Sequence, residues 1–371
     1  MKVIVVSSAP LVIEPGEFSG YGPYVKEMDI WAKYAKLGFV CPVLDSGDGM
    51  LLSEIDFPIE KVFRAKGFNV KSMAGILNAI RHSFYNFYLI YKAMRWADHI
   101  HLRCPGNISL MGCFVQILFP RKPKTCKYAG NWDPEASQPF SYRLQKWILN
   151  NTLLTRNMQV LVYGKWDGAS RNIKPFFTAS YWESQKQPVA QKSLDGMIRF
   201  VFVGTLSEGK RPLYAIKLIE KLDRSGKKVA LDFYGEGIQR GILESYIDEN
   251  NLAGFVTLNG NRSPEEIISA YKKSHFLILP SKSEGWPKVV AEAMFWGCCP
   301  VATRVSCVPY MLDEGKRGVL LTLDLDDDAA RIGSIIENQP DFNAKAAESM
   351  AWSRQFTLDL FDKEIKALLV Q

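Results

Sequence analysis

The fold of this chain is indicated most clearly by the sequence Ser283-Glu284-Gly285-Trp286-Pro287-Lys288-Val289-Val290-Ala291-Glu292-Ala293-Met294. It follows an apolar run, Phe276-Leu277-Ile278-Leu279, that ends at Pro280-Ser281. The apolar run predicts a buried strand, and the Gly-Trp-Pro turn predicts a tight loop that opens a helix. The order strand, loop and helix start is typical of a mostly parallel α/β sheet.

Two acids, Glu284 and Glu292, flank this turn eight residues apart. The start of a helix has free backbone N–H groups and the positive end of the helix dipole, so it suits an anion such as a phosphate. One acid before the loop and one inside the helix add acceptors for the hydroxyl groups of the same ligand. The stretch therefore predicts a nucleotide-sugar site.

These residues resemble the Glu-x7-Glu signature of the family 4 retaining glycosyltransferases, which share the two-domain GT-B fold. Other stretches resemble further strands and loops of that family's second domain, in the family's order. They are Val201–Pro212, Leu231–Gly237, Val256–Asn261, Gly297–Pro300, Pro309 and Gly318–Leu321. The order and spacing hold from about residue 198 to 322, whereas in the first half the resemblance depends on pattern more than on identities.

The resemblance implies an α/β protein with two doubly wound, Rossmann-like domains that face a cleft. Strands and helices alternate in both halves, which agrees with this fold class. A polar stretch from Tyr181 to Gly196 predicts the linker. We expect an acceptor-side domain at 1–188, a donor-binding domain at 189–350, and a helix at 351–371 that crosses back to the first domain.

Composition agrees with a two-domain globular protein. The chain has 371 residues, of which 47% are hydrophobic and 23% charged. Its seven cysteines lack metal-ligand spacing, and the first residues predict a strand rather than a signal peptide. No run of eighteen apolar residues occurs. We expect free thiols in a reducing cytoplasm and no membrane span.

Positive charge is concentrated in the first half. Residues 1–190 carry 23 Lys and Arg against 14 Asp and Glu, a net of +9. Since the whole chain has 46 bases and 39 acids, the remainder carries 23 against 25, a net of −2. A basic first half suits anionic lipid head groups, an anionic acceptor or simply solvent, and the charge does not separate these alternatives.

The resemblance assigns most donor-side roles to the signature and to a glycine loop. It implies that Glu292 accepts hydrogen bonds from ribose hydroxyls and that Glu284 faces the transferred sugar as a catalytic residue. The backbone N–H groups of Lys288 and Val289 would face the diphosphate, and Gly235 would belong to the donor-binding Gly-acid-Gly loop. Alternatively, Glu292 only complements the helix dipole and Glu284 is a solvated loop acid.

Lys210 and Arg211 follow the predicted strand at 200–203. No acidic metal-binding motif is evident, so we expect these cations to neutralise the departing nucleoside diphosphate without a metal. Lys210 matches the family's phosphate lysine, but Thr205 stands where the family usually has an arginine. A charged surface loop is the alternative interpretation.

Candidates in the first half rest on weaker patterns. Gly22, in Ser19-Gly20-Tyr21-Gly22-Pro23, takes the place of the family's Gly-Gly loop near the diphosphate, although two glycines often mean only a turn. The family's strand-end histidine is missing, and Asn131 and Asp133 stand in that loop. We expect Asp133 to act as acceptor-binding group or base and Asn131 to hold a sugar hydroxyl. His101, with Arg103 nearby, is the second choice, because such a histidine is more often structural.

A segment at 73–96 combines aromatic and basic side chains. It predicts either a helix face that rests on an anionic membrane beside a lipid-linked acceptor or, more commonly, a buried aromatic face. Mixed aromatic and basic stretches also occur in nucleic-acid binders. The nucleotide-sugar signature explains more of this chain, so we expect no nucleic-acid partner.

Taken together, these features predict a hexosyltransferase that uses a UDP- or GDP-linked sugar and no other cofactor, and the resemblance implies that it is retaining. Its acceptor would be a glycan or lipid-linked molecule of surface polysaccharide or glycolipid assembly. The protein would be cytoplasmic, or peripheral at the inner face of the membrane. Three alternatives stay open: a sugar-nucleotide epimerase, a phosphorylase of the same fold, and a catalytically degenerate protein that binds nucleotide sugar or scaffolds a complex.

Overall fold

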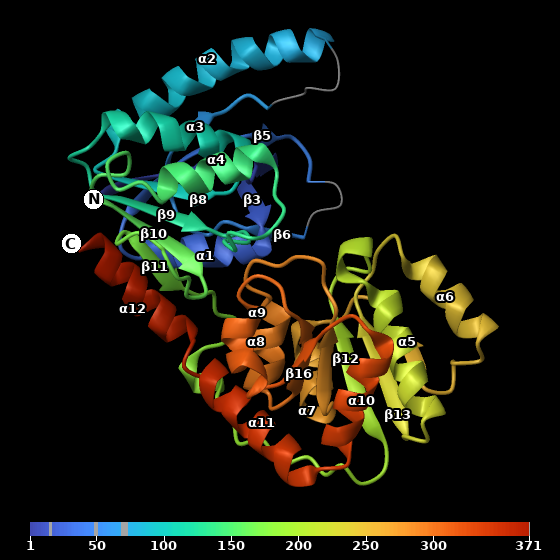
Figure 1. Cartoon of the computed structure of the whole chain (residues 1–371). Coiled ribbons are helices and arrows are strands. Elements are labelled where there is room, and N and C mark those ends of the chain that lie inside the picture. Colours follow the sequence, from blue (N-terminus) through green and yellow to red (C-terminus); the bar gives the residue numbers. More distant parts are fainter. Residues whose placement is uncertain (15–16, 48–50, 68–72, 371) are drawn as a thin grey trace. The chain divides into compact units, whose positions relative to one another are not determined.

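The computed structural model describes residues 1–14, 17–47, 51–67 and 73–370. These residues form two compact units, and Figure 1 labels most of their helices and part of their strands. Unit 1 comprises Met1–Phe176 and Phe361–Gln371, and unit 2 comprises Phe177–Leu360. Each unit contains a parallel sheet with helical connections, so the predicted pair of Rossmann-like domains is confirmed.

Unit 1 is built on a seven-stranded parallel sheet in the order β11-β10-β9-β8-β1-β4-β7. The strands are β1 (Lys2–Ser7), β4 (Lys36–Cys41), β7 (Ile59–Arg64), β8 (His99–Cys104), β9 (Lys124–Tyr128), β10 (Met158–Tyr163) and β11 (Ile173–Phe176). Both faces of the central strands are buried, which explains continuous apolar runs such as Val3-Ile4-Val5-Val6.

A small second sheet and the helices complete unit 1. The sheet has the order β5-β2-β3-β6, with β2 (Leu11–Glu14), β3 (Glu17–Tyr21), β5 (Val43–Leu44) and β6 (Leu52–Glu54). The helices are α1 (Gly22–Ala32), α2 (Met73–Trp96), α3 (Asn107–Val115), η1 (Gln116–Leu118) and α4 (Phe140–Leu149). The stretch 19–23, which we expected to be a glycine loop, is therefore the end of β3 and the start of α1.

Unit 2 contains a six-stranded parallel sheet in the order β14-β13-β12-β15-β16-β17. The strands are β12 (Ile198–Val203), β13 (Val229–Tyr234), β14 (Val256–Leu258), β15 (Phe276–Leu279), β16 (Cys299–Thr303) and β17 (Val319–Leu321). From β12 the order runs outwards in both directions, so β12 and β15 flank the topological switch point. Open α/β sheets bind ligands at the carboxyl ends of the strands at such a point.

Helices precede, connect and follow the strands of unit 2. They are η2 (Glu183–Gln185), η3 (Glu208–Lys210), α5 (Pro212–Arg224), α6 (Arg240–Glu249), α7 (Pro264–Lys273), α8 (Lys288–Phe295), α9 (Val308–Leu312), η4 (Asp313–Gly315), α10 (Leu325–Ile336) and α11 (Gln339–Ser353). Among the described residues, none of the helices combines the length and the apolar character needed to cross a membrane.

The last helix, α12 (Leu358–Leu369), begins in unit 2 and continues into unit 1. There it lies beside β11, the edge strand of the seven-stranded sheet (Figure 1). The Phe361 ring lies 5.6 Å from the Phe176 ring, and Asp362 pairs with Lys33 at 2.9 Å. This is the returning helix that the resemblance implied.

The boundary between the units lies at residues 176 and 177, whereas the polar stretch suggested residue 188. The residues after the boundary pack within unit 2 through Tyr181, whose ring lies 4.8 Å from that of Phe295. Residues 351–360, which we grouped with the returning helix, also belong to unit 2. Polarity alone did not reveal these contacts, because one aromatic side chain anchors an otherwise polar segment.

Candidate functional site

The candidate site lies in unit 2, where the loops that follow β12 and β15 are joined. The N–H group of Lys282 donates to the carbonyl of Gly209 at 2.7 Å. The Arg211 guanidinium donates to the carbonyl of Pro280 at 3.2 Å, and the Lys282 ammonium pairs with Glu208. These contacts place the predicted phosphate loop against the signature loop at the switch point.

Within the joined loops, Lys210 and Glu284 form an ion pair with Nζ and Oε1 2.5 Å apart. The Lys210 side chain is 28% exposed and that of Glu284 10%, so the ammonium still reaches solvent while the carboxylate is nearly buried. The structure thus brings together two residues that the sequence assigned from separate motifs. Thr205 is exposed on the same loop as Lys210.

The turn of the signature is held in place by the loop after β16. The Ser306 hydroxyl and the Cys307 thiol donate to the carbonyl of Gly285 at 3.1 and 3.0 Å. Burial raises the pKa of the Cys307 thiol, so the thiol stays protonated and remains a donor. The turn that carries Glu284 is therefore anchored by two side chains.

Helix α8 starts directly after this turn, with Pro287 as its N-cap residue. Pro287 itself makes no side-chain hydrogen bond that caps the helix start. Lys288 and Val289 are its first two helical residues, and N–H groups at these positions have no partner inside a helix. Their location is compatible with the predicted contact to a diphosphate, which stays a prediction.

Gly235 lies where the loop after β13 touches the loop after β12. Its φ of 141° favours glycine, and a Cβ atom would lie 2.0 Å from the carbonyl oxygen of Gly204. Its N–H group donates to the carbonyl of Gly260 at 2.8 Å, in the loop after β14. Position 235 therefore requires glycine so that three loops can pack at the carboxyl edge, whether or not Gly235 also contacts a nucleotide-sugar donor.

Replacing Gly235 by alanine is expected to lower the free energy of unfolding by about 2 kcal/mol or more, because the methyl group meets backbone that cannot move aside. Urea denaturation followed by circular dichroism measures this change. Gly241→Ala is the matched control, since a Cβ there meets nothing within 4 Å and the residue lies in α6. Equal effects of the two substitutions would contradict the close approach.

Glu292 makes contacts that the sequence did not predict. Its carboxylate accepts hydrogen bonds from the Ser180 hydroxyl at 2.6 Å and from the Tyr271 hydroxyl at 3.3 Å. Burial and the neighbouring Glu292 charge raise the pKa of Tyr271, so this hydroxyl is a donor. Glu292 thus ties the segment after the boundary to α8. Each carboxylate oxygen can accept a further bond, so the predicted contact with ribose stays a prediction.

His101 is fully buried in the middle of β8, not at the end of a strand. Its Nδ1 lies 2.9 Å from the Thr125 hydroxyl, and its ring lies 4.2 Å from that of Trp31. Burial lowers its pKa well below the usual value, so the ring is neutral. A direct contact between His101 and an acceptor is excluded in the described structure, because the ring has no exposed surface.

A buried charge cluster accounts for Arg103. Glu27 on α1 accepts from Arg103 at 3.0 Å and from Lys127 at 2.9 Å, and all three side chains are mostly buried. Burial opposes ionisation of Glu27, but the two cations outweigh it and lower its pKa to about 2. We did not predict this cluster; the available signal was a lysine between Cys126 and Tyr128, inside the strand Lys124–Tyr128.

Asn131 and Asp133 lie together in the loop after β9. Asn131 Oδ1 accepts from the N–H group of Asp133, and Asp133 Oδ1 accepts from the N–H group of Glu135, both at 2.9 Å. Both residues are half-buried. The Lys146 ammonium donates to the carbonyl of Asp133 at 2.8 Å. The loop is therefore ordered by its own side chains and presents one carboxylate and one amide.

Gly22 is buried at the start of α1. Its N–H group donates to the carbonyl of Leu51 at 2.9 Å, and a Cβ would lie 2.7 Å from the Ser53 hydroxyl. Packing against this neighbouring segment thus explains the glycine. The Gly22 N–H group is thus engaged within unit 1, and the predicted approach of this backbone to a diphosphate stays a prediction.

The chain is similar to known proteins in sequence and in fold. Residues 183–351 match the family model of glycosyl transferases group 1. An uncharacterized glycosyltransferase of Methanocaldococcus jannaschii is 27% identical over 158 residues, which are 42% of this chain and 43% of that protein. The chain therefore matches less than half the length of this curated relative.

Two further similarities extend over most of the chain. An uncharacterized 41.2 kDa protein in the cps region of Klebsiella pneumoniae is 22% identical over 322 residues, 81% of each chain. The crystal structure of Anabaena HepE in complex with UDP and glucose superposes with a TM-score of 0.67 at 16% identity, covering 100% of this chain and 99% of that one. The fold is thus that of the GT-B glycosyltransferases.

Proposed function

We propose that this protein is a retaining glycosyltransferase that moves a hexose from a UDP- or GDP-linked sugar to a glycan or lipid-linked acceptor. The observation that carries the proposal is the Lys210–Glu284 ion pair at the switch point of unit 2. It lies inside the segment that matches the glycosyl transferase family model. The HepE structure of the same fold contains UDP and glucose.

On this proposal the donor binds to unit 2. The ammonium of Lys210 and the first N–H groups of α8, at Lys288 and Val289, contact the diphosphate. Arg211 orders the loop through its bond to a carbonyl and adds positive charge. Glu292 accepts from the ribose, and Glu284 from a hydroxyl of the transferred sugar.

The chemistry follows from the charge that develops on the leaving group. As the bond between the anomeric carbon and the diphosphate breaks, negative charge grows on the phosphate oxygens, and Lys210 stabilises it. The acceptor hydroxyl attacks on the face from which the diphosphate departs, and its proton passes to the departing phosphate. Glu284 stabilises positive charge on the sugar ring. Side chains and helix N–H groups neutralise the leaving group, so the proposed reaction needs no metal.

We assign the acceptor to unit 1, with Asn131 and Asp133 as its contacts. Helix α2 exposes the aromatic side chains Phe84, Tyr85, Tyr88 and Tyr91, and its segment also carries bases. Exposed aromatic and basic side chains suit an anionic membrane surface. We therefore propose a cytoplasmic enzyme that is peripheral at the inner membrane face and acts in surface polysaccharide or glycolipid assembly. The relative from the cps region agrees with this role.

A second candidate is a catalytically degenerate protein that binds nucleotide sugar without transferring it. Two observations favour it: Thr205 replaces the family's usual arginine, and Glu292 already accepts from two protein hydroxyls. Both candidates require donor binding, and only the first requires release of a nucleoside diphosphate. The two can therefore be separated by experiment.

A screen of UDP- and GDP-linked sugars is expected to raise the midpoint of thermal unfolding for one donor. A ligand at about 100 times its Kd stabilises the folded state by about 2.7 kcal/mol. The same donor is then incubated with membrane extract, and release of nucleoside diphosphate is measured. Stabilisation without release would favour the degenerate protein. Absence of any stabilisation across both donor classes would overturn both candidates.

A further inference from the structure

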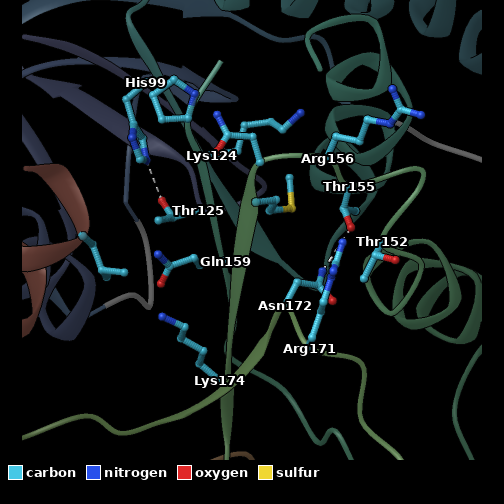
Figure 2. Close-up of a pocket in the computed structure, with 14 residues that line it drawn as sticks. His99, Lys124, Thr125, Thr152, Thr155, Arg156, Gln159, Arg171, Asn172 and Lys174 are labelled. Carbon is cyan, nitrogen blue, oxygen red and sulfur yellow. Dashed lines mark hydrogen bonds between the residues drawn. The ribbon is translucent and has the colours of Figure 1, made fainter. Parts of the chain in front are cut away.

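A cavity of about 670 Å³ opens at the amino ends of β8, β9, β10 and β11 in unit 1 (Figure 2). His99 and Lys124 are the first residues of β8 and β9, which places the cavity at the edge opposite the carboxyl ends. The loops that follow the carboxyl ends carry the proposed acceptor contacts. The cavity is thus separate from the site proposed above, and nothing in that proposal uses it.

The lining of the cavity is cationic. Four of its residues are Lys or Arg and, among the described lining residues, none is Asp or Glu. Arg156, Arg171 and Lys174 are exposed, and none of these three pairs with an acid in the described part of the chain. Three cations without counter-ions in one concave surface form an electrostatic site for an anion.

The walls behind these cations are fixed by hydrogen bonds. Asn172 donates to the carbonyl of Leu149 at 2.9 Å and to the Thr155 hydroxyl at 3.0 Å, and the His99 ring lies 2.9 Å from the Thr125 hydroxyl. Figure 2 draws the contacts between these lining side chains as dashed lines.

The fourth cation, Lys124, is bonded to the protein backbone. The Lys124 ammonium is almost fully buried and donates to the carbonyl of Phe119 at 2.9 Å. The surface of the cavity is therefore preformed, and the exposed cations need only turn their side chains to reach a ligand.

We propose that this cavity binds the phosphate ester or diphosphate of a ligand that also carries hydroxyl groups. The guanidinium groups of Arg156 and Arg171 match phosphate oxygens in pairs, and Lys174 adds a point charge. The hydroxyl and amide groups of Thr152 and Asn157 suit the hydroxyls of the ligand. The volume is within the range of small-molecule sites, about 300–1,000 Å³, and exceeds what one phosphate fills. A soluble phosphorylated sugar and a phospholipid head group share this chemistry.

The test uses the full chain and the double variant R156E/R171E. Pyrophosphate titrated by calorimetry is expected to bind the variant at least tenfold more weakly, since two attractive charges become repulsive. K61E/R64E is the matched control, because it makes the same charge change at exposed positions of β7 away from the cavity. Both double variants are made in the Lys210→Ala background, which weakens pyrophosphate binding at the proposed donor site and leaves the cavity intact, so that the remaining binding reports on the cavity. R156Q/R171Q repeats the test if the acidic variant fails to fold.

Vesicles separate the two sources of the phosphate. Sedimentation with phosphatidylcholine vesicles containing 30% phosphatidylglycerol, compared with pure phosphatidylcholine, reports on a lipid head group. Vesicle binding lost specifically in R156E/R171E identifies the head group, and pyrophosphate binding without vesicle binding identifies a soluble ester. The proposal is overturned if R156E/R171E and K61E/R64E behave alike in both measurements. Because neither readout needs a sugar donor, failure here is distinct from failure of the proposed transferase activity.

Discussion

Turnover of the nucleotide sugar is expected to fall about 100-fold, or about 3 kcal/mol in activation free energy, when Lys210 is replaced by alanine. The ammonium lies 2.5 Å from Glu284 and still reaches solvent, so it is placed to meet charge on a departing diphosphate. The substitution also leaves the nearly buried Glu284 carboxylate without its counter-charge. Steady-state release of nucleoside diphosphate from the donor found by the thermal screen measures the effect.

Lys282→Ala provides the control for this prediction. Lys282 is two residues before Glu284 and forms its own pair with Glu208, but both side chains are well exposed. Exposed ion pairs contribute about 0.2–1 kcal/mol, so turnover should change by less than about fivefold. Lys210→Arg keeps the charge and is expected to retain more activity than the alanine variant. If Lys210→Ala turned over at the wild-type rate, Lys210 would have no part in catalysis.

The free energy of unfolding is expected to fall by about 3–5 kcal/mol when Glu27 is replaced by alanine. Glu27 is the carboxylate shared by Arg103 and Lys127, and the side chains of Glu27 and Lys127 are 7% and 2% exposed. Its removal leaves the buried charges of Arg103 and Lys127 without a counter-charge. This costs more free energy than the ion pairs themselves contribute. Urea denaturation at pH 7 measures the change, and Glu60→Ala is the control, because the exposed Glu60–Lys36 pair should contribute under about 1 kcal/mol.

The same carboxylate predicts a dependence on pH. The pKa of Glu27 is lowered to about 2 in the folded protein, whereas an unfolded glutamate titrates near about 4.3. The contribution of the Glu27 charge to the free energy of unfolding is therefore fully present above about pH 4.3 and is lost as the pH falls towards 2. The stability difference between wild type and Glu27→Ala should narrow over that window. A difference that stayed constant down to about pH 2 would show that the Glu27 charge is not the cause.

The strands and the fold class were predictable because the information is local. Buried parallel strands need continuous apolar runs, and the runs at 3–6 and 276–279 met that need without reference to distant residues. The signature turn was predictable for the same reason: a Gly-Trp-Pro sequence after a strand leaves few ways to continue the chain. The wrong expectation at 19–23 came from reading glycines as a loop where pairing with a neighbouring strand extends β3.

Site residues were predictable only one motif at a time. Lys210 and Glu284 were each chosen from a local pattern, but their pairing depends on the loops of two strands that are adjacent in the sheet and distant in the chain. His101 could not be judged from its sequence neighbours, since Trp31 and Thr125, which contact its ring, lie on other elements. The hydrogen-bond partners of Glu292, Ser180 and Tyr271, could not be predicted either, because they lie on other segments of the chain.

Local sequence patterns were enough to predict two parallel α/β sheets, and to place the predicted phosphate loop and the Glu-x7-Glu turn after strands of the second sheet. Three arrangements became visible only in the folded protein: the Lys210–Glu284 pair, the buried contacts of Glu27 with Arg103 and Lys127, and the cavity lined by Arg156, Arg171 and Lys174. The physical reason is that backbone preference and apolar periodicity act over a few residues. Charge and hydrogen-bond complementarity depend instead on which strands the folded sheet sets side by side.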